Sequence, residues 1–229
     1  MYEAVHARPD GESTVARQAL TASEYGYDGI VVRNHGDDQA SYDPGQIADA
    51  YDIDVATGIE IRADDPSRAS GFLGNYRPDR TIVAVHGGTT AMNRFAVEQP
   101  AVDVLAHPMQ GSGDFNHVLA KAAAENGVRV EFSLGAVVGH SGGSRVRAIQ
   151  GLRKLRDLVE DADAPYVVSV DPSNHLELRA PRDLVALGER IGFEPAAVEA
   201  GLAEWGRLVD RNRERRSDRF IEPGVSIDE

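Results

Sequence analysis

Short apolar segments alternate with helical segments along almost the whole chain, and this alternation restricts the fold more than any other feature. The apolar segments lack a polar face, which is typical of strands that are buried on both sides of a parallel sheet. Seven strands are predicted, over 2–6, 28–33, 54–61, 81–86, 102–107, 128–134 and 166–170. Helices are predicted over 14–25, 89–98, 114–126, 144–160, 181–191 and 195–215. Such alternation implies parallel strands with right-handed crossover connections.

A closed barrel and an open, doubly wound sheet both satisfy this pattern. No GxGxxG follows the first strand, which removes the best indication of a dinucleotide-binding sheet. The length of 229 residues is common for a single α/β barrel. We therefore predict an α/β fold, a TIM-barrel-like (β/α) barrel that is incomplete with seven strands. One barrel domain is expected over 1–215, and the polar segment 216–229 is expected to leave it as a mobile C-terminal tail.

The helix over 114–126 has the clearest signals at both ends. Asp114 stands where an N-cap carboxylate would accept a free backbone N–H, and Gly127 supplies the left-handed residue that ends a helix. An apolar stripe with helical spacing is predicted to face the core, and it comprises Phe115, Val118, Leu119, Ala122 and Ala123.

The chain is strongly acidic and almost free of lysine. It has 24 basic residues against 37 acidic ones, a net charge of −13, and only two of the basic residues are lysines. Strong self-repulsion and hydration of this kind indicate adaptation to a salty cytoplasm, and we expect a halophilic archaeal source. The net charge alone argues against a nucleic-acid partner, but molar salt screens charges within about 3 Å and weakens that argument.

The sequence also limits where the protein works. It contains no cysteine, which excludes disulfides and thiolate metal sites and fits an intracellular protein. No apolar run approaches about 18 residues, so neither a membrane span nor a membrane partner is expected. The N-terminal residues lack a basic segment followed by a long apolar one, so no secretory signal is expected. We predict a cytoplasmic protein.

Histidines and acids stand repeatedly where the predicted strands end. They are His6, His35, Glu60, His86, His107, Glu131 and Asp171, with His175 shortly after. Functional residues of parallel barrels lie at these ends, and imidazoles with carboxylates suit zinc or manganese. The alternative is a set of hydrogen-bonded rim residues without metal. We also expect Pro108 to restrict His107 to extended backbone geometry.

Three segments resemble motifs of the polymerase-and-histidinol-phosphatase metalloenzyme barrels: GIEI at 58–61, LAHP at 105–108 and SVDPSNH at 169–175. The resemblance implies a metal cluster that hydrolyses phosphoesters, held by His6, His35, Glu60, His107, Asp171 and His175. Arg8 stands where a second histidine is expected, and Asn34 stands where an aspartate is expected. A free-standing metal-dependent phosphoesterase is therefore the alternative function.

A second resemblance covers nearly the whole chain. The segments 27–34, 102–134, 174–193 and 215–225 resemble the ribonuclease P protein component 3 family of archaea and eukaryotes. This implies a protein subunit whose catalytic partner is an RNA that removes 5′ leaders from precursor tRNA. It implies no catalytic residue, metal or cofactor on this chain, and Mg²⁺ for the RNA-catalysed reaction. The implied partners are ribonuclease P RNA, precursor tRNA, ribonuclease P protein component 2 and other protein subunits.

Basic residues are concentrated in two segments, 141–156 and 207–219. Guanidinium groups bind phosphate bidentately, so these segments are candidate RNA contacts. The predicted RNA-binding residues are Arg145, Arg147, Arg153, Lys154, Arg156, Arg179, Arg182, Arg211, Arg213, Arg215 and Arg216. A solvated helix face for the first segment, and internal ion pairs for the second, are the competing interpretations.

Overall fold

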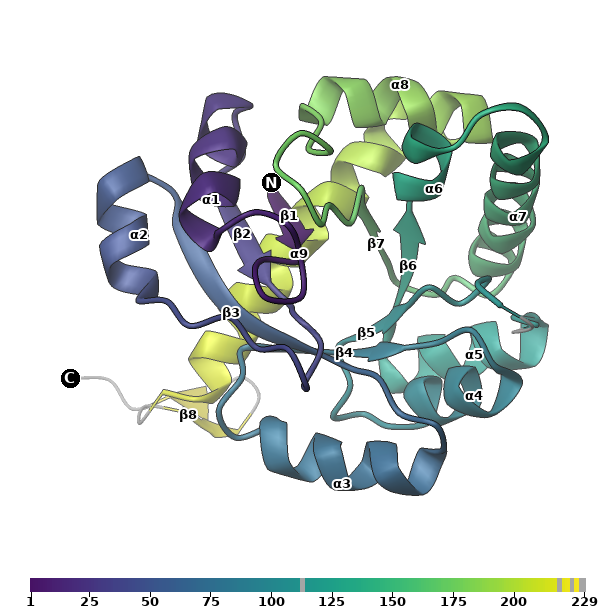
Figure 1. The fold of residues 1–229 in the computed structure, drawn as a ribbon. Coiled ribbons are helices and arrows are strands. Elements are labelled where there is room, and N and C mark those ends of the chain that lie inside the picture. Colours follow the sequence, from purple (N-terminus) through teal and green to yellow (C-terminus); the bar gives the residue numbers. More distant parts are fainter. Residues whose placement is uncertain (112–113, 218–219, 223–224, 227–229) are drawn as a thin grey trace.

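The computed structural model describes residues 1–111, 114–217, 220–222 and 225–226. Seven strands form one sheet in which each strand pairs in parallel with the next along the chain, which confirms the predicted seven-stranded barrel. They are β1 (Tyr2–Val5), β2 (Gly29–Val32), β3 (Asp54–Ile61), β4 (Ile82–His86), β5 (Val104–Ala106), β6 (Arg129–Ser133) and β7 (Tyr166–Ser169). Figure 1 shows the helices arranged around these strands.

Nine helices accompany the sheet in the described part of the chain. They are α1 (Val15–Glu24), α2 (Pro44–Tyr51), α3 (Pro66–Tyr76), α4 (Thr90–Val97), α5 (His117–Asn126), α6 (Gly135–Gly139), α7 (Gly142–Asp161), α8 (Pro181–Ile191) and α9 (Pro195–Arg215). The sequence prediction lacked α2, α3 and α6. The helices α2 and α3 each begin with an aspartate N-cap followed by proline, which is a readable start signal, but α2 buries no residue and so has no clear apolar stripe.

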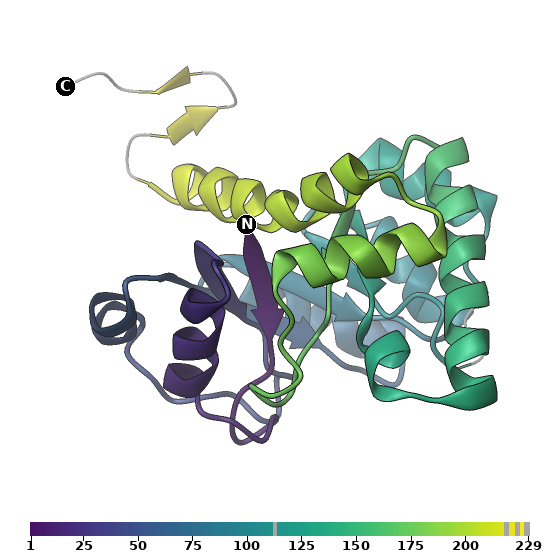
Figure 2. The same ribbon diagram turned by 90° about the horizontal axis from the view of Figure 1, so that it is seen from above.

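The barrel is open between β1 and β7, because no strand ladder joins these two edges in the described residues. Side chains and single hydrogen bonds close this seam instead. The Glu3 carboxylate accepts hydrogen bonds from the Ser169 hydroxyl and the Val170 N–H, and the His6 N–H donates to the Pro172 carbonyl over 3.0 Å. The helix α9 packs against β1 and β7, and it crosses β1 in both ribbon views (Figures 1 and 2).

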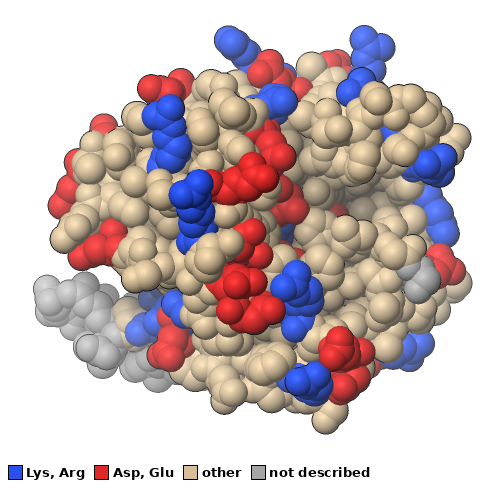
Figure 3. Space-filling model, in the orientation of Figure 1, with Lys and Arg blue, Asp and Glu red and all other residues tan. Residues whose placement is uncertain are grey.

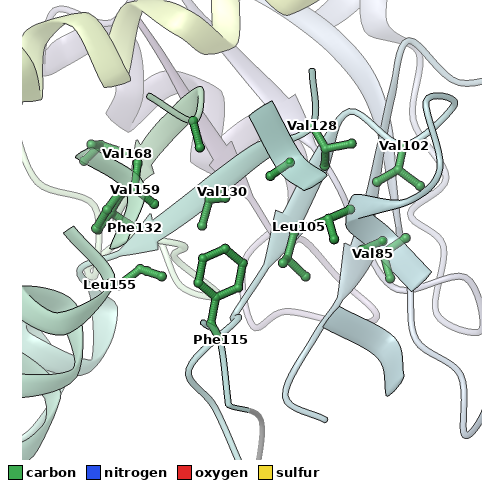
Figure 4. Packing of buried hydrophobic residues seen from close by; sticks show 14 of the residues in the cluster. Val85, Val102, Leu105, Phe115, Val128, Val130, Phe132, Leu155, Val159 and Val168 are labelled. Carbon is green, nitrogen blue, oxygen red and sulfur yellow. The ribbon is translucent and has the colours of Figure 1, made fainter. Parts of the chain in front are cut away.

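Trp205 of α9 fills space among the strands of the sheet. Its side chain is fully buried, and its indole N–H donates to the Val168 carbonyl over 3.0 Å. It packs in one apolar cluster with residues from six strands, among them Ala4, Val31 and Val104. The largest apolar cluster lies elsewhere, between β3–β7 and the helices outside them, and Figure 4 shows Phe115 and Leu105 within it.

The start of α5 differs from the prediction. Asn116, not Asp114, is the N-cap, and its side-chain oxygen accepts from the backbone N–H groups of Val118 and Leu119. Phe115 is buried ahead of the helix, and Val118 is 52% exposed instead of facing the core. The predicted N-cap lies two residues too early, because aspartate and asparagine are both good N-cap residues and the sequence offers one of each. The choice of N-cap decides which residues belong to the helix, so the predicted apolar stripe wrongly included Phe115 and Val118. Gly127 ends the helix with a φ of 64°, as predicted.

The helix α9 ends at Arg215, next to the predicted domain boundary. Within the predicted tail 216–229, the described residues form a short antiparallel pair, β8 (Phe220–Glu222) and β9 (Val225–Ser226). Figure 2 shows this pair beyond the end of α9. Residues 218–219, 223–224 and 227–229 lie outside the described residues, and the division into 1–215 and 216–229 stays a prediction.

Candidate functional site

Side chains from all seven strands, or from the loops directly after them, meet at the carboxyl ends of the strands. We call this set the strand-end cluster; it comprises His6, Asp10, Arg33, His35, Glu60, His86, His107, Glu131 and Asp171. Parallel strands place these ends at one edge, so residues far apart in sequence become neighbours. The sequence predicted seven of the nine members, and Asp10 and Arg33 were missed.

Arg33 lies at the base of the cluster, directly after β2. Its guanidinium is fully buried and donates from Nη2 to Asp171 over 2.5 Å and to Glu131 over 2.7 Å. Its Nη1 lies 3.5 Å from a Glu60 carboxylate oxygen. The opposite side of the guanidinium stacks at 5.6 Å from the Trp205 ring centroid, a cation–π distance.

Four imidazoles surround the carboxylates above Arg33. His86 Nδ1 lies 2.5 Å and His35 Nε2 3.4 Å from the same Glu60 oxygen. His107 Nε2 lies 3.1 Å from one Asp171 oxygen, and His6 Nε2 lies 3.2 Å from the other. The imidazoles are close neighbours, with centroids of consecutive rings about 5 Å apart.

Asp10 ties the outer side of the cluster to the first loop. Its carboxylate contacts His6 Nδ1 at 2.5 Å and His35 Nδ1 at 2.9 Å, and it accepts from the His35 backbone N–H over 3.0 Å. Asn34 fixes the same loop, because its amide oxygen accepts from the Ala7 N–H over 2.9 Å. Asn34, which stands where the metalloenzyme motif has an aspartate, therefore makes a structural contact between two strand ends.

The charges of the cluster shift the pKa values of its members in opposite directions. Burial lowers the pKa of His107, but the hydrogen bond and charge of Asp171 outweigh burial and raise it to about 9. Burial likewise opposes protonation of His6, yet its contacts with Asp10 and Asp171 hold its pKa well above the ordinary value. Burial raises the pKa of Glu60, but the Arg33 charge and the contacts with three histidines together outweigh burial and hold this pKa well below its usual range. The protonated forms of His6 and His107 and the ionised form of Glu60 therefore stabilise one another, whereas burial raises the pKa of Glu131.

The backbone at two cluster residues is unusual. His107 has a φ of 50° and Asp171 a φ of 56°, and both residues precede a proline. The prediction that Pro108 holds His107 in extended geometry is therefore wrong. Proline disfavours the right-handed helical region for the residue before it, but the left-handed region stays accessible, and the ion pair with Asp171 fixes the His107 side chain there.

Two residues of the metal interpretation lie elsewhere. His175 Nδ1 contacts the Ser13 hydroxyl at 2.8 Å, and none of the contacts found among the described residues joins it to the strand-end cluster. Arg8 is exposed and donates to the Glu12 carbonyl within its own loop. Of the six residues in the alternative ligand set, the structure therefore brings five together, namely His6, His35, Glu60, His107 and Asp171.

A cleft of about 410 Å³ opens beside the cluster. His107 and Asp171 line one side, and Ser133, His140 and Arg179 line others. Figure 3, in the orientation of Figure 1, shows acidic side chains gathered over the middle of this face, with basic side chains beside them and along the right-hand margin.

Several predicted RNA-binding residues around α7 and α8 hydrogen bond only to neutral groups in the described structure. Arg145 donates to the His140 carbonyl, Arg153 to the Arg190 carbonyl and Arg147 to the Ser144 hydroxyl. Arg179 donates to two backbone carbonyls. The positive charge of these guanidinium groups is therefore not neutralised by a bonded carboxylate. Beside them, a shallow groove of about 620 Å³ is lined by Arg145, Arg179, Arg190, Asp183 and apolar residues.

The remaining predicted RNA-binding residues mostly form internal contacts. Lys154 pairs with Asp114 at 3.0 Å, and Arg156 pairs with Asp157 at 2.7 Å. On α9, Arg211 pairs with the buried Asp103 at 2.7 Å, and Arg213 forms a bidentate pair with Asp54. The last members are exposed: Arg182 lies 3.8 Å from Asp183, Arg216 donates to the Thr81 hydroxyl over 3.4 Å, and Arg215 forms the end of α9.

The comparisons with known proteins agree on one family. The family model described as RNase P subunit p30 matches residues 1–217. A relative from Haloarcula marismortui named "Ribonuclease P protein component 3" is 69% identical over 229 residues, which is 100% of this chain and 97% of the relative. A relative of the same name from Natronomonas pharaonis is 63% identical over 228 residues, which is 100% of this chain and 95% of the relative. Both organisms are haloarchaea, the kind of source that the acidic composition predicted.

Two solved structures share the fold. One, from the cryo-EM structure of archaeal ribonuclease P with mature tRNA, has a TM-score of 0.84 at 23% identity and covers 99% of this chain and 97% of its own. The other is a histidinol phosphate phosphatase from Lactococcus lactis in complex with zinc, L-histidinol and phosphate. It has a TM-score of 0.57 at 12% identity, and the match covers 84% of this chain and 94% of the phosphatase chain. The fold is thus common to both resemblances, but the sequence matches decide between them, and the chain belongs to the RNase P subunit p30 family.

Proposed function

We propose that this chain is a protein subunit of ribonuclease P and supports an RNA that removes the 5′ leader from precursor tRNA. The observation that carries this proposal is the match along the whole chain to relatives named "Ribonuclease P protein component 3", at 69% identity. A partial match could come from a shared barrel alone, whereas this match covers 100% of this chain and 97% of the relative.

The chemistry of the strand-end cluster supports a non-catalytic role. A metal-dependent phosphoesterase needs open coordination positions and a water that a metal ion activates. Here the carboxylates of Glu131 and Asp171 are occupied by the Arg33 guanidinium. The phosphoesterase alternative is therefore not favoured, and we propose that catalysis belongs to the RNA, with Mg²⁺ as the metal ion of that reaction.

The RNA-binding surface is proposed to lie on α7 and α8 and on the segment before α8. Arg145, Arg147, Arg153, Arg179 and Arg182 project positive charge there, and four of them bond only to neutral groups. Phosphate oxygens would provide the anionic partners that the protein itself does not supply. Arg211 and Arg213 satisfy their charges within the molecule, so we assign them to stability in place of RNA contact.

We also propose the partners and the location that the family implies. The partners are ribonuclease P RNA, precursor tRNA, ribonuclease P protein component 2 and further protein subunits, and the compartment is the cytoplasm. None of the helices in the described part of the chain has the length and apolar character that a membrane span requires. Because molar salt weakens counterion release, we expect protein–protein contacts and shape to supply much of the affinity, with the arginines positioning the RNA.

The first experiment tests the subunit itself. Tagged protein is recovered from its own cells at high salt, and the eluate is assayed for leader cleavage before and after micrococcal nuclease digestion. Activity that co-purifies and is destroyed with the RNA is expected. An eluate without RNA and without cleavage activity would overturn the proposal.

The second experiment tests the surface. A variant with Arg145→Ala, Arg147→Ala and Arg179→Ala is compared with a control that carries Arg62→Ala, Arg68→Ala and Arg94→Ala, three exposed arginines elsewhere on the molecule. Both variants lose the same charge. The measured quantity is the slope of the logarithm of the RNA-binding constant against the logarithm of the salt concentration. Each phosphate contact that is removed should reduce the magnitude of this slope by about 0.9, and we expect this reduction only in the first variant. Equal slopes for both variants would place the RNA contacts on another surface.

A further inference from the structure

The zinc-bound fold neighbour raises the question of whether the strand-end cluster can hold a metal ion. Two groups of three donor residues have ligand atoms within 4.8 Å of one another: His6 with Asp10 and His35, and His35 with Glu60 and His86. The donor types suit zinc, manganese or cobalt. Whether a metal ion fits also depends on the other side chains of the cluster, above all on its cationic ones.

Arg33 decides whether a metal ion fits in the strand-end cluster. Its guanidinium enters the cluster from below and contacts the three deepest carboxylates, at 2.5 Å from Asp171, 2.7 Å from Glu131 and 3.5 Å from Glu60. One oxygen of Asp171 contacts both the guanidinium and His6 Nε2, so the carboxylate that joins the histidines is already bound to a cation. A second cation between these groups would meet the fixed charge of Arg33 at close range in a buried environment, where screening is weak.

The surroundings hold the guanidinium in this position. The side chain is fully buried, and its guanidinium carbon lies 5.6 Å from the Trp205 ring centroid, so the guanidinium has no access to solvent. One oxygen of Glu60 and one of Glu131 are buried without a hydrogen-bond partner among the described residues. The Arg33 guanidinium lies 3.5 Å from Glu60 and 2.7 Å from Glu131, so it is a cation in contact with both carboxylates.

We propose that the Arg33 guanidinium is the resident cation of the strand-end cluster and takes the place that a divalent metal ion would otherwise hold. The cluster is then a charge-balanced structural core that excludes metal while Arg33 is present. Removal of Arg33 should leave carboxylates and imidazoles from several strands around a space with no cation, and this set should bind a transition metal. The inference concerns the cluster alone and stands independently of the proposed RNA surface.

The test compares untagged wild-type protein with Arg33→Ala, using Co²⁺ as the probe because its visible absorption reports nitrogen and oxygen ligands. The matched control is Arg129→Ala, since Arg129 is also a mostly buried arginine in an ion pair, with Glu204, but lies outside the cluster. After gel filtration, Arg33→Ala should retain about one equivalent of Co²⁺ and show a higher Tm with the metal. Wild type and Arg129→Ala should retain almost none and show no change in Tm.

Two results would overturn the proposal. The first is stoichiometric Co²⁺ on the wild-type protein that is lost in Glu60→Gln, because the metal would then share the cluster with Arg33. The second is a folded Arg33→Ala that binds no Co²⁺. If Arg33→Ala does not fold by itself, refolding that depends on Co²⁺ supports the proposal, and failure to refold with Co²⁺, Zn²⁺ or Mn²⁺ counts against it.

Discussion

The Glu3 carboxylate on β1 accepts a hydrogen bond from the Ser169 hydroxyl on β7. This contact joins the two edge strands of the open barrel, between which the described residues form no strand ladder. The carboxylate is fully buried, and it also accepts from the backbone N–H groups of Ala4 and Val170. A titratable group therefore sits in the one seam of the sheet that side chains must close.

The Glu3 contact predicts a pH dependence of stability. Burial raises the pKa of Glu3 from 4.5 to about 7, and its hydrogen bonds offset only part of this. Because the folded chain binds this proton more tightly than the unfolded chain, the contribution is complete below pH 4.5 and is lost as the pH rises through about 7. Between about pH 5 and 6.5, wild type should lose roughly 2 kcal/mol of unfolding free energy through this group, and Glu3→Gln should not. Urea denaturation at each pH measures this, and an unchanged pH slope in Glu3→Gln would contradict it.

His107 predicts a second pH dependence of the same sign, over a higher pH range. Burial lowers its pKa, but Asp171 raises it from 6.5 to about 9, so its stabilising effect is complete below pH 6.5 and is lost as the pH rises through about 9. His107→Gln should therefore cost roughly 2–3 kcal/mol near pH 6 and little above pH 9. The assembled complex should keep its leader-cleavage rate at temperatures where the variant is folded. The control is His117→Gln, on the exposed side of α5.

A cleavage result would distinguish a structural from a catalytic His107. If His107→Gln folds normally and the complex loses cleavage, His107 takes part in the reaction, and the assignment of catalysis to the RNA alone fails. If stability falls and cleavage persists, the strand-end cluster is confirmed as a structural core. Both quantities are needed, because a loss of cleavage caused by unfolding would otherwise imitate a catalytic effect.

Trp205 predicts a large packing effect. It is fully buried, it supports Arg33 from below, and its N–H bonds the Val168 carbonyl. Trp205→Ala should cost about 3–5 kcal/mol, because it removes apolar contacts and leaves a cavity. Circular dichroism in urea measures this, since the variant has no tryptophan for fluorescence. Leu176→Ala is the control, because Leu176 is 72% exposed and its loss should change stability by less than about 0.5 kcal/mol.

Sequence reasoning predicted the barrel well, because buried parallel strands leave a strong signal. All seven strands were found, with β5 shorter than expected at Val104–Ala106. Two of the three helices that were missed lack a strong apolar stripe, whereas the third, α3, buries Ala69 and Leu73 and was missed despite its aspartate–proline start. The helix α2 buries no residue, and α6 has only five residues. Periodicity detects packing against a core, so elements that pack weakly escape it.

The cluster was predicted in part for a related reason. Strand-end position identified the histidines and carboxylates, but it gave no reason to include Arg33, which stands in the apolar run GIVVR. An arginine directly after a buried strand needs carboxylate partners, and this requirement was the available signal. Asp10 lies in a loop, and its position depends on the path of the chain after β1. The φ of 50° at His107 likewise depends on a tertiary contact that local sequence does not specify.

Asp103 provides a final prediction, which separates structural arginines from RNA-binding ones. Its buried carboxylate accepts from Arg77 at 2.5 Å, from Arg211 at 2.7 Å and from the Asn212 amide at 2.9 Å. Asp103→Asn leaves two partly buried guanidinium groups without their anion and should cost about 2–3 kcal/mol. Asp54→Asn breaks the more exposed pair with Arg213 and should cost less than about 1 kcal/mol.

Asp103→Asn, together with Arg211→Ala, also tests the assignment of α9 to stability. If Arg211 serves stability, Arg211→Ala should lower the urea midpoint about as much as Asp103→Asn, and the folded variant should bind ribonuclease P RNA with the wild-type salt slope. If Arg211 instead contacts phosphate, Asp103→Asn should leave RNA affinity intact or increase it, because the guanidinium is released. Arg211→Ala would then reduce the slope by about 0.9. Measuring the urea midpoint and the salt slope on the same protein preparations decides between these outcomes, because only a phosphate contact changes the slope of a fully folded chain.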